Sequence, residues 1–161
     1  MKRFGLYILF IALTIVIPTH TVAEETIYNN YEISGAGTAT QGTYLVQVSV
    51  NSKKKSIDDA DLKKAAVHGV LFRGFANAQR RQHQRPLAGN ADNEYQHKDF
   101  YLDFFGKEGT AVNYASIVPG SRSITKSGKT YSIKATISVN KEDLLKYLSD
   151  NGVVSSLNTA F

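Results

Sequence analysis

Residues 131–139 alternate strictly between apolar and polar side chains. An alternation of period two places one set of side chains on each face of a β-strand, so these residues predict a strand with one buried and one solvated face. Residues 43–51 repeat the pattern, with Tyr44 and three valines on one side. Two such strands need partners and a cover for their apolar faces, which favours an antiparallel sheet packed against helices.

The stretch between these two strands begins with a long helix. Ser56 provides a predicted N-cap, acidic residues follow it, and the helix is expected over residues 57–78. Its middle is apolar nearly all round, which predicts a central buried helix. Gly69 and Gly74 cost helix propensity, so they indicate a close approach to a neighbouring backbone. We expect His68, on the same helix, to be a hydrogen-bonded structural residue.

The remaining elements complete a fold prediction. We expect a short strand over residues 31–36, a strand over residues 112–124 with a kink near Pro119, and a short aromatic helix that ends at Gly106 with its rings in the core. Asn140 is expected to cap a C-terminal helix. The elements predict an α+β fold: a two-layer sandwich of a mostly antiparallel four-stranded sheet with helices packed on one face, in the order ββααββα.

The N-terminus has the pattern of a secretory signal. Lys2 and Arg3 precede an apolar run over residues 4–17, and small residues follow it. This predicts a cleaved signal peptide over residues 1–23 and one α+β domain over residues 24–161. The alternative is an uncleaved membrane anchor, which the length disfavours because a spanning helix needs about 20 apolar residues.

The chain contains no cysteine, although the signal pattern directs it to an oxidising compartment. Disulfides, a thiolate nucleophile and cysteine-ligated metals are therefore excluded. An exported protein stabilised by its core alone is typical of the bacterial envelope, so we expect a periplasmic or extracellular protein. No later segment is apolar and long enough to cross a bilayer, so no membrane span is expected after signal cleavage.

The search for catalytic chemistry yields no catalytic residue. The sequence has no nucleotide-binding, zinc-protease or serine-hydrolase motif. His83 and His97 lie near Asp92, Glu94 and Asp99, but their spacing matches no recurrent metal site. We therefore predict no metal and no cofactor.

Residues 79–98 are expected to form a long polar loop, and a basic cluster surrounds its start. The candidate binding residues are Arg73, Arg80, Arg81, His83 and Arg85. Guanidinium groups bind phosphate, sulfate or carboxylate through paired hydrogen bonds. The alternative is a solvated, mobile loop whose charge is balanced by the acidic residues that follow. Signal cleavage would remove Lys2 and Arg3 and lower the net charge from +5 to +3, and this modest charge disfavours a nucleic-acid partner.

Three segments carry a resemblance to a known type of protein. They are residues 37–49, residues 65–74, and residues 131–140 together with Leu144 and Leu145. In these segments the chain resembles uncharacterised exported α/β envelope proteins of the Bacteroidetes type. More distantly, it is similar to the N-terminal domain of the flagellar outer-membrane T protein. The resemblance implies a fold and an envelope location, and it carries no catalytic residue.

Two functional hypotheses follow from these observations. The first is a non-enzymatic envelope module that binds another protein or an anionic surface glycan through the arginine-rich loop. The second is a small hydrolase or lyase that uses His83 or His97 with a loop carboxylate as acid and base. The sequence leaves the oligomeric state open.

Overall fold

The computed structural model describes residues 30–77, 82–90 and 92–155. The predicted signal peptide lies outside these residues. Within them, no helix is both long and apolar enough to cross a membrane.

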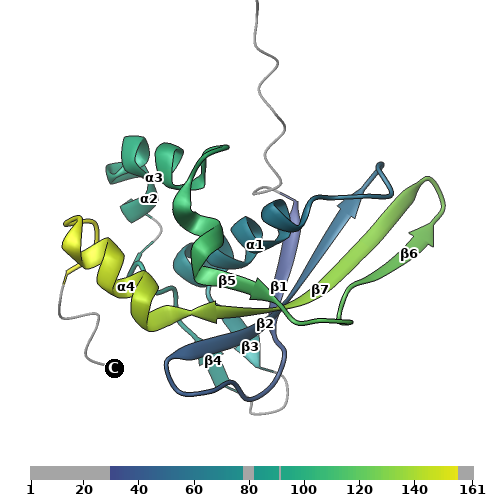
Figure 1. Ribbon diagram of the computed structural model, residues 1–161, viewed down its shortest axis with the longest axis horizontal. Coiled ribbons are helices and arrows are strands. Elements are labelled where there is room, and N and C mark those ends of the chain that lie inside the picture. Colours follow the sequence, from purple (N-terminus) through teal and green to yellow (C-terminus); the bar gives the residue numbers. More distant parts are fainter. Residues whose placement is uncertain (1–29, 78–81, 91, 156–161) are drawn as a thin grey trace, which may run out of the picture.

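A five-stranded antiparallel sheet forms one layer of the fold (Figure 1). Its strands are β1 (Tyr31–Gly35), β2 (Thr43–Ser52), β5 (Ala115–Ile117), β6 (Ser123–Ser127) and β7 (Thr130–Asn140). The order is β1-β2-β7-β5, and β6 also pairs with β7. The two strands predicted from alternation are thus central neighbours, with Val48 opposite Ala135 in their register.

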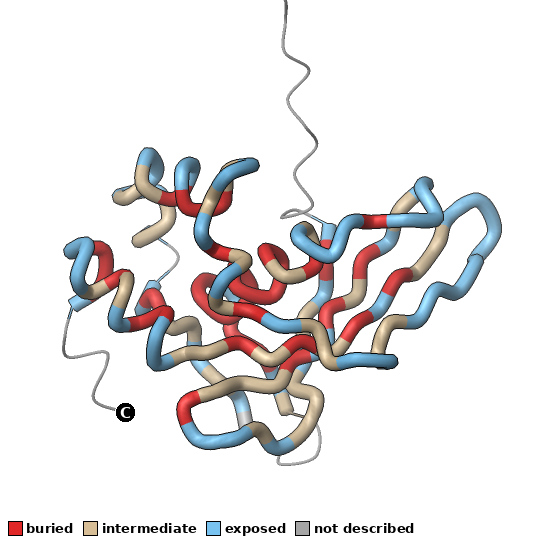
Figure 2. The backbone as a smooth tube through the Cα atoms, viewed as in Figure 1, coloured by how far each residue is buried: buried red, intermediate tan, exposed pale blue. Residues whose placement is uncertain are grey.

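Helices form the second layer, and the predicted α+β class is confirmed. Helix α1 (Asp59–His68) packs on β2, β5 and β7, and its continuation η2 (Gly69–Arg73) is a π-helix. The short helices α2 (Asp92–Gln96) and α3 (Lys98–Phe105) lie farther along the same layer. Helix α4 (Lys141–Asp150) follows β7 directly. Buried residues concentrate where α1 faces the strands (Figure 2).

The prediction of four strands and a single strand over residues 112–124 was wrong. Residues Thr110–Tyr114 form the 3₁₀ helix η3, and the remainder is divided into β5 and β6. The expected kink is present: Gly120 has a φ of 72° beside Pro119. A left-handed glycine redirects the chain there, so both short strands pair with β7 at different places along its length.

The long helix predicted over residues 57–78 ends earlier than expected. Its N-cap is Asp58 rather than Ser56, and no side chain caps the helix there. Gly74, with a φ of 66°, ends η2. The chain then continues as β3 (Phe75–Asn77), which pairs with β4 (Gln82–Gln84) in a second, two-stranded sheet. The predicted structureless loop over residues 79–98 was therefore wrong, because it includes β4 and α2.

The expected close approaches at the helix glycines are confirmed. A Cβ atom on Gly69 would lie 2.6 Å from Cδ1 of Ile33, on β1. A Cβ atom on Gly74 would lie 2.2 Å from the backbone oxygen of Gln84. Gly69 thus makes room for the side chains of Ile33 and Tyr31 from β1, whereas Gly74 lets the helix end lie directly against the backbone of β4.

Two further predictions are confirmed at the helix termini and in the core. The rings of Tyr101, Phe104 and Phe105 on α3 are buried, and Phe100 packs against them from a partly exposed position. Asn140 caps α4, since its side chain accepts a hydrogen bond from the backbone N–H of Asp143 at 3.2 Å.

Candidate functional site

Arg73, the first of the predicted binding residues, ends η2 and turns toward β1. Its Nη1 donates a hydrogen bond to the backbone oxygen of Tyr31 at 2.8 Å. The guanidinium carbon lies 4.1 Å from the centre of the Tyr31 ring, within the range of a cation–π contact. Arg73 therefore contributes to attaching the central helix to the edge strand.

The small β3–β4 sheet carries the rest of the predicted basic cluster that the structure describes. His83 lies on β4 opposite Ala76, and Arg85 follows directly after the strand with an exposed side chain. Gly74 lies against the backbone of Arg85, so the chain segments that carry Arg73 and Arg85 pass close to each other at one end of this sheet. Arg80 and Arg81 lie outside the described residues, in the connection between the two strands.

A groove lies beside this sheet, with a volume of about 470 Å³. Its lining combines β3, β4, the start of β2 and the connection between β1 and β2. The lining residues are Gly37, Thr38, Ala39, Thr43, Tyr44, Leu45, Phe75, Asn77, His83 and Gln84. Of the five predicted binding residues, His83 lines the groove directly.

An aromatic pair forms the apolar part of the groove. The rings of Tyr44 and Phe75 meet edge to face with 5.3 Å between their centres. Nζ of Lys141 lies 5.2 Å from the centre of the Tyr44 ring. A tyrosine hydroxyl is protonated at neutral pH and can donate a hydrogen bond, and burial raises the pKa of Tyr44 further.

Among the described residues that line the groove, the polar ones supply hydrogen-bond groups, and none of them is a carboxylate. Amides come from Asn77 and Gln84, hydroxyls from Thr38 and Thr43, and an imidazole from His83. Such a lining can orient a ligand through several hydrogen bonds. It offers no imidazole–carboxylate pair of the kind that acid–base catalysis by His83 would need.

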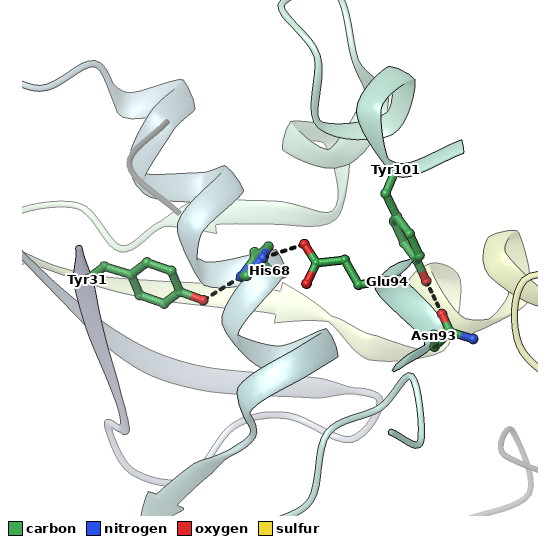
Figure 3. A network of polar contacts seen from close by, with 5 residues as sticks. All are labelled: Tyr31, His68, Asn93, Glu94 and Tyr101. Carbon is green, nitrogen blue, oxygen red and sulfur yellow. Dashed lines mark hydrogen bonds and ion pairs between the residues drawn. The ribbon is translucent and has the colours of Figure 1, made fainter. Parts of the chain in front are cut away.

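An imidazole–carboxylate pair does exist elsewhere, and it uses His68 (Figure 3). Nδ1 of His68 lies 2.7 Å from the hydroxyl of Tyr31, and Nε2 lies 3.0 Å from Oε1 of Glu94. Because a carboxylate only accepts, Nε2–H is the donor to Glu94. In the neutral ring Nδ1 then accepts a hydrogen bond from the Tyr31 hydroxyl. The prediction that His68 is hydrogen-bonded and structural agrees with this geometry.

The electrostatics of this network keep His68 neutral. Burial lowers the pKa of His68, the pair with Glu94 opposes that effect, and the positive charge of Arg73 adds to the lowering. The network also reaches α2, none of whose side chains is buried. Asn93 on α2 accepts a hydrogen bond from the Tyr101 hydroxyl at 2.8 Å and donates one to the backbone oxygen of Val153 at 2.7 Å.

The network has no open position for a substrate at its tyrosine end. Tyr31 is 4% exposed and His68 is 7% exposed, so only Glu94, with a side chain 45% exposed, reaches solvent. The predicted loop carboxylate thus pairs with the buried histidine rather than with His83 or His97. In the described part of the chain, no group of three histidine or acidic side chains is arranged to hold a metal ion.

Comparison with known protein families, curated proteins and solved structures found no match to this chain. The resemblance to exported Bacteroidetes-type proteins and to the flagellar T protein therefore stays a prediction from the residues. The site has to be interpreted from its own geometry.

Proposed function

We propose that this chain is an exported envelope protein whose folded domain is a non-enzymatic binding module for an anionic group on a surface glycan or a partner protein. One observation supports this most directly: the groove is lined by His83 and Gln84, from the same strand that leads into Arg85. Arg80 and Arg81 immediately precede that strand in the sequence. Arg85 therefore directly follows the polar wall of the groove, and two further arginines lie close to that wall in the sequence.

The composition of the groove fits a ligand that is polar on one side and apolar on the other. The Tyr44 and Phe75 rings offer an apolar surface, while amides and hydroxyls can hold a ligand's oxygen atoms. The guanidinium groups of Arg80, Arg81 and Arg85, which flank β4 in the sequence, could add charge-assisted hydrogen bonds to a sulfate, phosphate or carboxylate. The signal-peptide pattern supports export, and a bacterial envelope presents such anionic polymers and proteins.

Binding of dextran sulfate to residues 24–161 tests the anionic-ligand part of this proposal, with neutral dextran as the reference polymer. The variant R80Q/R81Q/R85Q should bind dextran sulfate at least tenfold more weakly, since a single charge-assisted hydrogen bond is worth roughly 1.5 kcal/mol. The control variant K63Q/K98Q/K107Q removes the same charge from lysines that are not among the groove's lining residues. Its binding should fall less than about threefold, because surface charges contribute little individually.

Two results would contradict the proposal. Equal losses of dextran sulfate binding in both variants would show that only net charge matters. Unchanged binding by R80Q/R81Q/R85Q would show that these three arginines are not part of the site. The groove itself is tested by H83A/Q84A, which should weaken binding without changing the unfolding midpoint in urea. If dextran sulfate does not bind, recovery of a partner protein from the solubilised envelope tests the other ligand in the proposal, an anionic partner protein.

A further inference from the structure

A second basic surface lies at the other end of the large sheet. It consists of Lys53, Lys54, Lys55, Lys126 and Lys129, and we call it the lysine ridge. Ser52 and Lys126 flank Tyr131 on its two sides in the strand register. Because neighbouring strands are about 4.8 Å apart, the lysines after Ser52 and those of the β6–β7 hairpin share one edge.

The lysine ridge is far from the groove. The groove takes residues from the first positions of β2, whereas the ridge starts after Ser52 at the strand's last position. Thr43, Tyr44 and Leu45 line the groove, so the remaining residues of β2 separate the two surfaces by roughly 25 Å at about 3.3 Å per residue. Both surfaces can therefore be occupied at the same time.

The ridge is open to solvent. All five lysines are exposed, and so is every residue of β6. Apart from Gly128 itself and its two chain neighbours, no atom of the described residues lies within 4 Å of the position of a Cβ on Gly128, at the turn between β6 and β7. The hairpin extends away from α2, α3 and α4, and its turn is pale blue in the burial view (Figures 1 and 2).

The charge of the ridge is not neutralised inside the described fold. The ion pairs among the described residues are His68–Glu94, Arg122–Asp59 and Lys146–Asp150, and none includes a ridge lysine. Arg122 forms an ion pair with Asp59 at the start of α1, and it also donates a hydrogen bond to the backbone oxygen of Ile57 at 2.5 Å. Because Asp59 is paired with Arg122, the acidic residue nearest to Lys55 in the sequence that is in none of these ion pairs is Asp58.

We propose that the lysine ridge is a contact surface for an anionic lipid bilayer. Lysine ammonium groups are flexible point charges, which suit a broad layer of phosphate groups better than they suit one oriented anion. A protruding hairpin can lie against a surface larger than itself, whereas a single polyanionic strand is bound more typically along a positively charged groove. Ile124, 42% exposed on β6, adds one apolar side chain to the same hairpin.

The expected strength of binding to an anionic bilayer follows from the number of lysines in the ridge. A basic residue close to an anionic bilayer contributes roughly 1 kcal/mol, which corresponds to about fivefold in partitioning. Because the contacts are exposed, salt should weaken them strongly: the screening length falls from about 8 Å at physiological ionic strength to about 3 Å at 1 M.

Co-sedimentation of residues 24–161 with lipid vesicles tests the proposal. All described helices and strands lie within this fragment, and the apolar N-terminal run that could itself enter a bilayer is absent from it. Vesicles of phosphatidylcholine with roughly one third phosphatidylglycerol should bind the protein at low salt and release it near 1 M salt. Vesicles of phosphatidylcholine alone should not bind it.

Matched variants locate the contact. K126Q/K129Q should lower partitioning by about 25-fold, and K53Q/K54Q/K55Q by more, if each lysine contributes about fivefold. K98Q/K107Q removes two exposed lysines near α3 and should change partitioning less than about twofold. Circular dichroism and the urea midpoint of each variant confirm that the fold is retained.

Several outcomes would overturn the proposal. They are absence of binding at low salt, equal binding to neutral vesicles, or equal losses in the ridge and control variants. If the protein never binds vesicles and the ridge variants bind dextran sulfate more weakly, the partner of the ridge is a soluble polyanion instead. The variant R80Q/R81Q/R85Q should keep its vesicle binding, which separates this proposal from the one for the groove.

Discussion

The hydroxyl of Tyr31 lies 2.7 Å from Nδ1 of His68, and this contact joins the edge strand β1 to the last turn of α1. His68 continues the connection to Glu94, so one imidazole connects the sheet, the central helix and α2. Buried polar groups are costly unless they are hydrogen-bonded, and here both ring nitrogens have partners. The network therefore fixes how α2, which buries no side chain of its own, lies over the core.

Tyr31→Phe removes the donor to Nδ1 and leaves the rest of the ring in place. A buried acceptor without a partner costs about 1–3 kcal/mol, so the free energy of unfolding should fall by that amount. Urea unfolding at pH 7.5 measures it. The control Tyr95→Phe removes a hydroxyl from an exposed ring, and its effect should stay within about 0.5 kcal/mol. Equal effects of the two substitutions would contradict the role of the buried contact.

Acid should destabilise the fold through His68. Its pKa is lowered in the folded state, mainly by burial, while the unfolded chain titrates near the ordinary value of 6.5. As the pH falls below about 6.5, the unfolded state binds the proton first, so the free energy of unfolding decreases until the folded pKa is passed. Above that range His68 contributes no pH dependence. NMR titration of the ring protons checks this, and a folded pKa at or above 6.5 would contradict it.

The central strands and the helix cap could be predicted because each depends on local pattern. Alternation identified β2 and β7, whose partners face each other in register, and Asn140 with Asp143 identified the start of α4. The strands that the sequence pattern did not identify correctly are short. Strands β3, β4 and β5 have three residues each, too few for a periodic signal to emerge, and they are held by their pairing with other segments.

The buried network could not be predicted because its members are distant in the chain. Tyr31 lies 37 residues before His68, and Glu94 lies 26 residues after it. The available signal was a histidine in an otherwise apolar helix, which indicates a buried polar group with partners but does not identify them. The same applies to the groove, because its walls come from separate segments that only the fold brings together.

Gly74→Ala should destabilise the protein strongly, since the new Cβ would lie 2.2 Å from the backbone oxygen of Gln84 and the residue has a φ of 66°. Backbone overlap and left-handed strain together predict a loss of at least about 2 kcal/mol. Gly120→Ala is the control, because it has a similar φ of 72° but open space around it. Its cost should be about 1 kcal/mol, from strain alone. Urea unfolding of both variants separates overlap from strain.

Asn140→Ala removes a side-chain cap that the fold uses. The side-chain Oδ1 of Asn140 accepts a hydrogen bond from the backbone N–H of Asp143, so its loss should cost about 1 kcal/mol of unfolding free energy. Asp58 occupies the equivalent position at α1 and makes no such bond. Asp58→Ala should therefore lose only the helix-dipole contribution, less than about 0.5 kcal/mol at moderate salt. The two variants are compared by urea unfolding at low and high salt. Only the Asp58 effect should shrink with salt, and the reverse pattern would show that Asn140 does not act as the cap.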